Sequence, residues 1–230
     1  MSSPKTEDAA LVPNLALAAP PGNGEGPRRR LTAGRRRQQL IDVALESFAR
    51  NGLEATTMDD IASAAGVTKP LLYQHFRSKR ALFLELLSAV ARDIVEEIAK
   101  AVADAKTPRQ EVEAGFAAYF HFALTHENAF RLLFDRSVPH DSELNEALLR
   151  VEDAFAEAVG PLIEADIDPE HQRFLAEAVV GMAEAASRSW LRWRQQGGTR
   201  LPDEVRAEAD KLARRTADLA WAGLRSIHRD

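Results

Sequence analysis

The chain has 230 residues, of which 28% are charged and 45% hydrophobic, and these are the proportions of a globular protein. It contains no cysteine, which excludes disulfides, a thiol nucleophile and Cys-ligated zinc or iron–sulfur sites. No stretch approaches the roughly 20 apolar residues that a membrane helix needs. The N-terminus lacks the basic start and long apolar core of a secretory signal. We therefore expect a cytoplasmic protein without membrane contact.

The charge is distributed unevenly along the chain. The formal net charge is -5, which taken alone argues against binding to nucleic acid. Residues 28–80 nevertheless contain eleven Lys or Arg and only five Asp or Glu, so this segment carries +6. Residues 1–27 carry -2, which leaves -9 for residues 81–230. A basic front and an acidic back are expected when only one domain meets phosphate.

The chain divides into three parts. Residues 1–30 are rich in Pro, Gly, Ala and Ser and end in three arginines, which predicts a disordered arm with a basic end. Beyond them, apolar residues recur every three or four positions, which predicts an all-α fold of about nine helices. We expect a DNA-binding domain of three helices at 31–80 and a helical bundle for ligand binding and dimerisation at 81–230. The expected helices cover 36–50, 57–65, 69–76, 78–105, 108–125, 127–134, 141–163, 169–196 and 203–228.

The first three helices have the signals of a helix-turn-helix. The first helix should end at Gly52, which suits a backbone with positive φ. Thr57 can cap the second helix, with Asp60 three residues later in the position of a capping-box acid. Gly66 ends that short helix, and Thr68 caps the third helix almost at once. Two short helices joined by a tight turn containing glycine are typical of a helix-turn-helix.

The third helix is the expected recognition helix. Recognition helices contact base edges with their N-terminal residues, which here are Thr68, Lys69 and Pro70. Tyr73 and Gln74 follow one turn later, where a tyrosine can bond phosphate and a glutamine can read adenine. Further along, Lys79 starts a helix after the Ser78 cap and can approach the DNA backbone.

The stretch from Leu40 to Leu84 resembles the DNA-binding domain of the TetR/AcrR transcriptional regulators. Its most specific part is GVTKPLLYQHFRSKRALF, and the motif covers about a fifth of the chain. The matching residues are Ala44, Phe48, Gly52, Thr56, Thr57, Met58, Ile61, Ala62, Ala65, Gly66, Val67, Leu72, Tyr73, His75, Phe76, Ser78, Lys79 and Leu82. The resemblance implies an all-helical homodimer that binds a palindromic double-stranded DNA operator and responds to a small ligand.

The resemblance also implies DNA-contacting roles. Thr57 and Tyr73 would bond phosphates, and Lys79 would pair with one. Pro70 departs from the small residue often found there, and it removes a backbone N–H that could bond phosphate. The arginines at 28–37 can add a phosphate or minor-groove contact, as basic arms do. The full set of expected DNA contacts is Arg36, Thr57, Thr68, Lys69, Pro70, Tyr73, Gln74, His75 and Lys79.

The C-terminal half is rich in aromatic residues from 116 to 134. They form either an ordinary core or the wall of an apolar tunnel for a hydrophobic effector. The segments FRLLFDRSV (130–138) and GMAEAASRSWL (181–191) also resemble acyl-CoA-sensing regulators of fatty-acid synthesis, which makes a long-chain acyl-CoA or fatty acid the leading candidate. The expected ligand-binding residues are Phe116, Tyr119, Phe120, Phe130, Phe134, Phe155, Phe174, Met182 and Trp190.

The last two helices, at about 169–196 and 203–228, are the candidate dimer seam. Close helix approach is allowed by the small residues Ala176, Ala178, Gly181, Ala183, Ala185 and Ala186, and the last helix offers apolar surface at Leu212, Ala217, Leu219, Ala220 and Leu224. Gly181 inside a helix costs about 1 kcal/mol relative to Ala, which indicates a packing reason. Two helices from each chain would make a two-fold four-helix interface. Packing of the same surface within one chain is the alternative.

Other functions fit the residues less well. His121, His126 and Glu127 do not have the HExxH spacing of a zinc enzyme, and the only glycine-rich stretch lies in the arm, so we expect no catalysis, no cofactor and no metal. A pure lipid-binding module does not need the +6 segment. Two further alternatives stay open: a DNA-binding protein without an effector, and a repressor of an efflux operon that responds to drugs or aromatic compounds.

Overall fold

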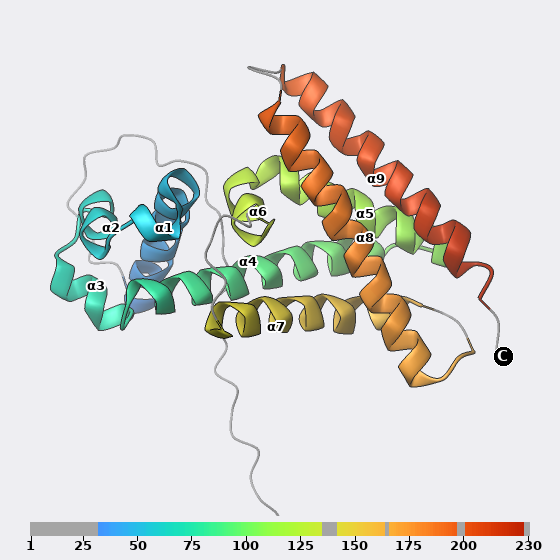
Figure 1. Cartoon of the computed structure of the whole chain (residues 1–230), viewed down its shortest axis with the longest axis horizontal. Coiled ribbons are helices and arrows are strands. Elements are labelled where there is room, and N and C mark those ends of the chain that lie inside the picture. The colour runs from blue at the N-terminus through green and yellow to red at the C-terminus, as the bar shows by residue number, and fades with distance from the viewer. Residues whose placement is uncertain (1–31, 135–141, 164–165, 197–200, 228–230) are drawn as a thin grey trace, which may run out of the picture.

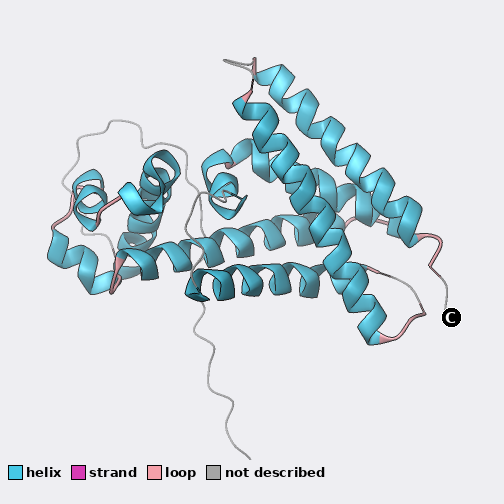
Figure 2. Ribbon diagram, viewed as in Figure 1, coloured by secondary structure: helices cyan, strands magenta, loops and turns pink. Residues whose placement is uncertain are grey.

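The computed structural model describes residues 32–134, 142–163, 166–196 and 201–227. In this part of the chain it contains nine α-helices, one short 3-10 helix and no strand, which confirms the all-α prediction (Figures 1 and 2). The expected arm at 1–30 lies outside the described residues. The helices are α1 (Ala33–Ala55), α2 (Met58–Ala64), α3 (Lys69–His75), α4 (Lys79–Val102), α5 (Pro108–Thr125), α6 (Glu127–Phe134), α7 (Ser142–Val159), η1 (Gly160–Leu162), α8 (Pro169–Gln195) and α9 (Pro202–Leu224).

The first three helices pack around a small core with the start of α4. The apolar stripe of α1 faces inward, and the ring of Phe48 meets the ring of Phe83 edge-on at 5.2 Å. Helix α3 contributes Leu72, which is fully buried, and Phe76 closes its end. The Thr57 hydroxyl accepts the Asp60 N–H, and the Asp60 side chain accepts the Thr57 N–H, which is the predicted capping box.

Three helix ends differ from the expected ones by four or five residues. The first helix continues to Ala55, but its backbone leaves helical geometry at Gly52, where φ is +77°. The seventh ends at Val159, because Pro161 has no N–H with which to continue it, and η1 follows. The last ends at Leu224 rather than 228 because the chain tightens into a turn, with the Ser226 N–H bonded to the Gly223 carbonyl.

Helix α4 connects the helix-turn-helix domain with the C-terminal bundle. Figure 1 shows it running from the group of α1, α2 and α3 to the bundle, where it lies beside α7. It also packs on α5, α6 and α1. In the bundle, α5 packs against α9, α7 against α8, and α8 against α9. The expected domain boundary at residue 80 therefore falls inside one continuous helix.

Candidate nucleic-acid interface and effector cavity

The turn between α2 and α3 is fixed by its own backbone. Gly66 has φ +63°, a conformation that residues with a Cβ rarely adopt. The Gly66 N–H bonds the Ser63 carbonyl, and the Val67 N–H bonds the Ala62 carbonyl, so the last turn of α2 is closed. Thr68 follows as the N-cap of α3, and its side chain makes no capping hydrogen bond. The Thr68 hydroxyl is therefore not needed to start the helix.

Helix α3 presents one exposed face and one buried face. Leu72 and Phe76 are buried against the core. The side chains predicted to meet DNA lie on the opposite, exposed face, and Tyr73 is 44% exposed although it is a large apolar ring. An exposed aromatic residue with a polar tip suits a partner that is absent from the single chain. The structure brings these expected contact residues to one surface: Thr68, Lys69, Pro70, Tyr73 and Gln74.

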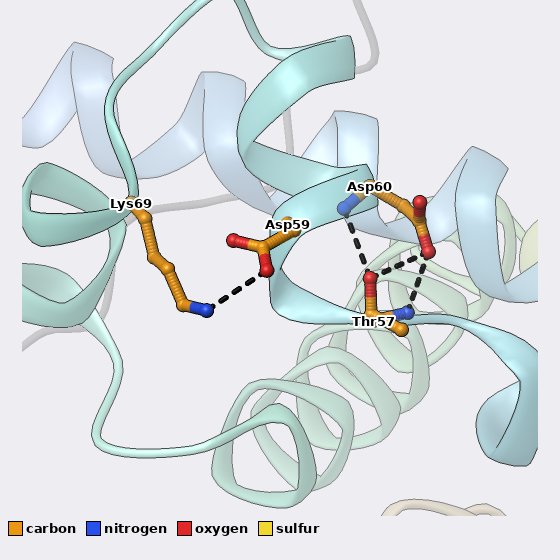
Figure 3. Close-up of polar contacts among 4 residues, drawn as sticks. All are labelled: Thr57, Asp59, Asp60 and Lys69. Atoms are coloured by element: carbon orange, nitrogen blue, oxygen red, sulfur yellow. Dashed lines mark hydrogen bonds and ion pairs between the residues drawn. The ribbon is translucent and has the colours of Figure 1, made fainter.

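Of the two acidic residues in the first turn of α2, Asp59 reaches toward Lys69 on this face, whereas Asp60 is turned toward Thr57 (Figure 3). The Thr57 hydroxyl donates to the Asp60 carboxylate at 2.6 Å, so this proton is used within the capping box. These hydrogen bonds from Thr57 lower the pKa of Asp60. The Lys69 ammonium forms an ion pair with the Asp59 carboxylate at 2.8 Å. This hydrogen-bonded ion pair raises the pKa of Lys69.

Lys79 has partners inside the protein. Its ammonium donates to the carbonyls of Leu53 at 2.6 Å and Glu54 at 3.0 Å, near the C-terminal end of α1. A cation suits this position because helix C-terminal carbonyls carry partial negative charge. Two of its three N–H donors are thus used to hold α4 on α1, and the third is left for another acceptor.

Arg37 is a second link among the helices of this domain. Its guanidinium pairs with Glu85 of α4 at 2.6 Å, donates to the His75 carbonyl at 3.4 Å and lies 4.5 Å from the centre of the Phe76 ring. Burial is the main cause that raises the pKa of Glu85, and Arg37 opposes it. The recognition helix α3 is therefore held between α1 and α4 by one side chain.

The remaining predicted contacts, Arg36 and His75, are both half-buried. The Arg36 side chain donates to Gln39 at 2.7 Å. His75 ends α3, and burial, followed by the charges of Arg37 and Arg36, lowers its pKa. The imidazole is thus held in its neutral form more strongly than a free histidine.

A cavity of about 90 Å³ lies within the C-terminal bundle. Its wall is almost entirely apolar, and three aromatic side chains from the predicted set line it: Phe116, Tyr119 and Phe155. The Tyr119 hydroxyl lies 2.6 Å from the Ser187 hydroxyl, which itself donates to the Ala183 carbonyl at 2.7 Å. Burial raises the pKa of Tyr119, so the phenol stays neutral. The other lining residues are Ile98, Glu111, Val112, Gly115, Val159, Leu162, Ile163, Val179, Val180, Ala183, Glu184, Ala220 and Leu224.

The other predicted ligand-binding residues lie elsewhere. Phe120 and Phe130 pack against the Tyr119 ring from within the core, at 5.4 and 5.5 Å between ring centres. Trp190 is buried and stacks on Trp193, and Met182 packs against the edge of the core. The side chain of Phe134 is outside the described residues.

Phe174 requires a correction, because we expected an interior position and the structure places it 63% exposed on α8. It does not line the cavity. The physical reason is that α8 turns Ala176 and Val180 inward, both of which are buried, and this leaves Phe174 on the outer side of the helix.

The sequence reasoning missed two groups of residues. One is the aliphatic part of the cavity wall, such as Ile98, Val179 and Leu224, whose helical spacing marks them as core without showing that they face a void. The other is Asp59, whose acidic side chain in the first turn of α2 is not needed by the capping box. A second carboxylate beside Asp60, which the capping box does not use, was the feature of the sequence that could have drawn attention to Asp59.

No group of three or more His, Asp or Glu residues in the described ranges is arranged to hold a metal ion. Among the helices that the structure describes, none has the length and apolar character needed to cross a membrane.

Comparison with known proteins places this arrangement in a family. Residues 40–86 match the model of the bacterial regulatory proteins of the tetR family. Over 90% of its length the chain is 29% identical to the HTH-type transcriptional activator FasR of Mycolicibacterium smegmatis, of which the match covers 91%. Over 84% of its length it is 27% identical to the HTH-type transcriptional repressor KstR2 of Rhodococcus jostii, of which 93% is covered. These matches support a transcriptional regulator of the TetR family, with the family's DNA-binding domain at residues 40–86.

The resemblance seen in the sequence is therefore confirmed, and the same matches support a transcriptional regulator that responds to a ligand. The two relatives named above are an activator and a repressor, so both activation and repression occur among proteins similar to this chain. The fold is also that of the regulator FadR of Bacillus subtilis, solved in complex with stearoyl-CoA. This match has a TM-score of 0.67 at 16% identity and covers 83% of the present chain and 98% of the FadR chain.

Proposed function

We propose that this protein is a cytoplasmic repressor that binds a palindromic operator as a homodimer and takes a hydrophobic effector in the C-terminal cavity. A long acyl chain, presented as acyl-CoA or fatty acid, is the leading effector. The observation that carries the proposal is the pairing of an exposed recognition helix in a basic segment with an apolar cavity in an acidic bundle, joined by the single helix α4.

The DNA-binding part rests on the exposed face of α3. Thr68, Lys69 and Pro70 begin the helix and would meet base edges, while Tyr73 and Gln74 follow on the same face. The remaining expected contacts, Thr57, Arg36, His75 and Lys79, lie at or near helix ends of the same domain and would contact phosphates. In a dimer, two such helices would enter successive major grooves about 34–36 Å apart.

The dimer part rests on the outer faces of α8 and α9. Phe174 on α8 and Leu219 on α9 are 63% and 65% exposed, which is unusual for large apolar side chains unless a partner covers them. The exposed face of α8 also carries Ala178, Gly181 and Ala185, which allow a second helix to approach closely. A Cβ added at Gly181 meets no heavy atom of the single chain within 4 Å, so contacts within the described chain do not require a glycine here, and a second helix packed on this face would supply the reason.

This interface has a direct test. Replacing both Phe174 and Leu219 by glutamate should convert the dimer into a monomer in light scattering coupled to size-exclusion chromatography. The matched control is Leu201→Glu, since Leu201 is 66% exposed but precedes the first turn of α9. A double variant that stays dimeric would exclude this seam.

The effector part rests on the cavity. Its volume of about 90 Å³ is smaller than the roughly 300–1,000 Å³ of typical ligand pockets, so a long acyl chain must push the surrounding helices apart. Ile98 on α4 is part of the wall, and it lies 19 residues, or about 28 Å of helix, from Lys79 at the start of α4. An expanding ligand would therefore displace the helix that holds the DNA-binding domain, and this would shift the population away from the DNA-bound spacing.

The test is fluorescence anisotropy with labelled DNA from upstream of the protein's own gene. Binding is measured at several known salt concentrations, and stearoyl-CoA is then titrated into the complex. We expect salt-dependent binding and dissociation at low micromolar stearoyl-CoA. Tighter DNA binding in the presence of stearoyl-CoA would support lipid sensing but would make the ligand a corepressor rather than a releasing ligand. DNA binding that ignores stearoyl-CoA would overturn the acyl effector.

A drug-like aromatic effector is the second candidate, because three aromatic rings line the cavity. Release of DNA by planar aromatic compounds, but not by stearoyl-CoA, would favour it. Operator binding that responds to neither class would favour a regulator without an effector in this cavity.

A further inference from the structure

The Lys69–Asp59 ion pair stands out on the proposed DNA-binding face. Lys69 is the first residue of α3, and its ammonium lies 2.8 Å from the Asp59 carboxylate in the first turn of α2 (Figure 3). Both side chains are largely exposed, at 51% and 63%. The pair thus places a negative charge beside Lys69, the first positively charged residue of the proposed recognition helix.

The fold does not need Asp59 for its local structure. Asp60 supplies both carboxylate contacts of the capping box with Thr57, through the Thr57 N–H and hydroxyl. Asp59 is exposed, and its described side-chain contact is the one to Lys69. An exposed ion pair of this kind contributes only about 0–1 kcal/mol to stability. The pair is therefore better explained by an effect on binding than by an effect on folding.

Ion pairing changes which partners an ammonium prefers. Attraction to phosphate is an attraction between net charges, and an adjacent carboxylate cancels much of the charge that a phosphate experiences. Hydrogen bonding to a base edge depends on N–H donors, and an ammonium has three, of which Asp59 takes one. The two remaining donors can still reach acceptors such as O6 and N7 of guanine in the major groove.

We propose that Asp59 is a positioning residue that holds Lys69 for contact with base edges and weakens its attraction to phosphate, and so raises the specificity of operator binding. The inference rests on the proposed DNA-binding function. It assigns Lys69 to base reading rather than to backbone binding. Without Asp59, Lys69 becomes an ordinary phosphate-binding cation that supports binding to any DNA sequence.

The test compares full-length wild type with Asp59→Asn on two DNA duplexes, the footprinted operator and a random sequence, over a range of salt. For random DNA we expect tighter binding, by roughly 1.5- to 5-fold for each Asp59 removed. The slope of log K against log salt should steepen by about 0.9 for each Lys69 that gains a phosphate. Affinity for the operator should stay the same or fall, so the ratio of operator to random affinity decreases.

Two further variants separate positioning from a simple loss of negative charge. Glu54→Gln removes one negative charge from the end of α1, where the residue is exposed, and should leave the operator-to-random ratio unchanged. In a Lys69→Gln background, Asp59→Asn should no longer alter that ratio, because Asp59 acts through Lys69. Rescue of the ratio by Asp59→Glu, which restores the carboxylate, would support the same role.

Three outcomes would overturn the inference. Equal gains on operator and random DNA would show that Asp59 acts only as a diffuse charge. An unchanged ratio and salt slope would show that the pair has no role in DNA binding. If wild type and variant fail to bind any duplex even at low salt, the proposed function itself fails, and this inference fails with it.

Discussion

Replacement of Lys79 by methionine tests whether the domain is held together as the structure indicates. The change keeps the aliphatic stem but removes the ammonium that donates to the Leu53 and Glu54 carbonyls. A hydrogen bond from a charged donor contributes about 1.5–3 kcal/mol when it is shielded from water and less when water can replace it. The first bond is partly buried and the second is exposed, so we expect a total loss of about 2 kcal/mol.

The assay is thermal unfolding followed by circular dichroism, with Lys100→Met as the matched control. A loss of that size should lower the Tm by roughly 4–8 °C for a chain of this length. Lys100 is on the same helix but 70% exposed, and its contact with Glu96 is 3.7 Å long, so its replacement should shift the Tm by less than about 2 °C. An unchanged Tm for Lys79→Met, together with a salt slope for DNA binding reduced by about 1, would refute the structural role and assign the ammonium to phosphate.

Three other predictions follow from the same geometry. Tyr73→Phe should leave the Tm unchanged but weaken binding to every DNA sequence by roughly 3- to 10-fold in anisotropy, because the exposed hydroxyl would bond DNA rather than the protein. The contrasting variant Leu72→Ala should lower the free energy of unfolding in denaturant by about 2–5 kcal/mol, because Leu72 is fully buried. Ala183→Leu should fill the cavity and weaken the response to stearoyl-CoA by at least about ten-fold with DNA affinity intact, while Ala117→Leu on the exposed side of α5 should change neither. Burial lowers the pKa of both His75 and His126, so the folded state binds fewer protons than the unfolded state below about pH 6.5. The free energy of unfolding should therefore fall as the pH drops from there through the lowered pKa values. A His75→Gln/His126→Gln variant should show a flatter dependence of this free energy on pH between about pH 7.5 and 5.5.

The helices of the DNA-binding domain could be predicted because their signals are local. Thr57 and Asp60 lie three residues apart, the spacing of a capping box, and Gly66 supplies the positive φ that ends α2. The same reasoning located the boundaries of α5 and α6 as the structure has them. Each of these features depends on neighbours within about one turn, so one sequence is sufficient to find it.

The cavity could be predicted only in part, because a void depends on what distant side chains fail to fill. Phe116, Tyr119 and Phe155 were expected in its wall and line it. Phe174 was assigned to the wrong side of α8, and the reason is visible in the sequence. Residues 176–186 of that helix are mostly small or apolar on every face, so their periodicity does not indicate which side points inward.

The contacts that hold the domain together were not predictable, because they join residues far apart in the chain. Arg37 and Glu85 are 48 residues apart, and Lys79 reaches back 26 residues to the Leu53 carbonyl. Their charges alone suggested solvent or phosphate as partners. The structure instead uses both cations to fix α4 on the helices that carry the recognition face.

The contacts of α4 with its neighbours determine how a ligand in the cavity could affect the DNA-binding domain. Helix α4 is fixed to α1 by Lys79 and Glu85, and Arg80 on its next position pairs with Glu143 at the start of α7 at 2.5 Å. Helix α7 carries Phe155 in the cavity wall, and α4 carries Ile98. If a ligand separates α4 from α7 at the cavity, we expect both helices to rotate about the Arg80–Glu143 contact. Arg80→Gln breaks this contact and should uncouple effector binding from DNA release. Calorimetry should show an unchanged affinity for stearoyl-CoA, while anisotropy should show that the ligand no longer releases DNA. DNA release by the variant at the same ligand concentrations as wild type would place the coupling in another contact.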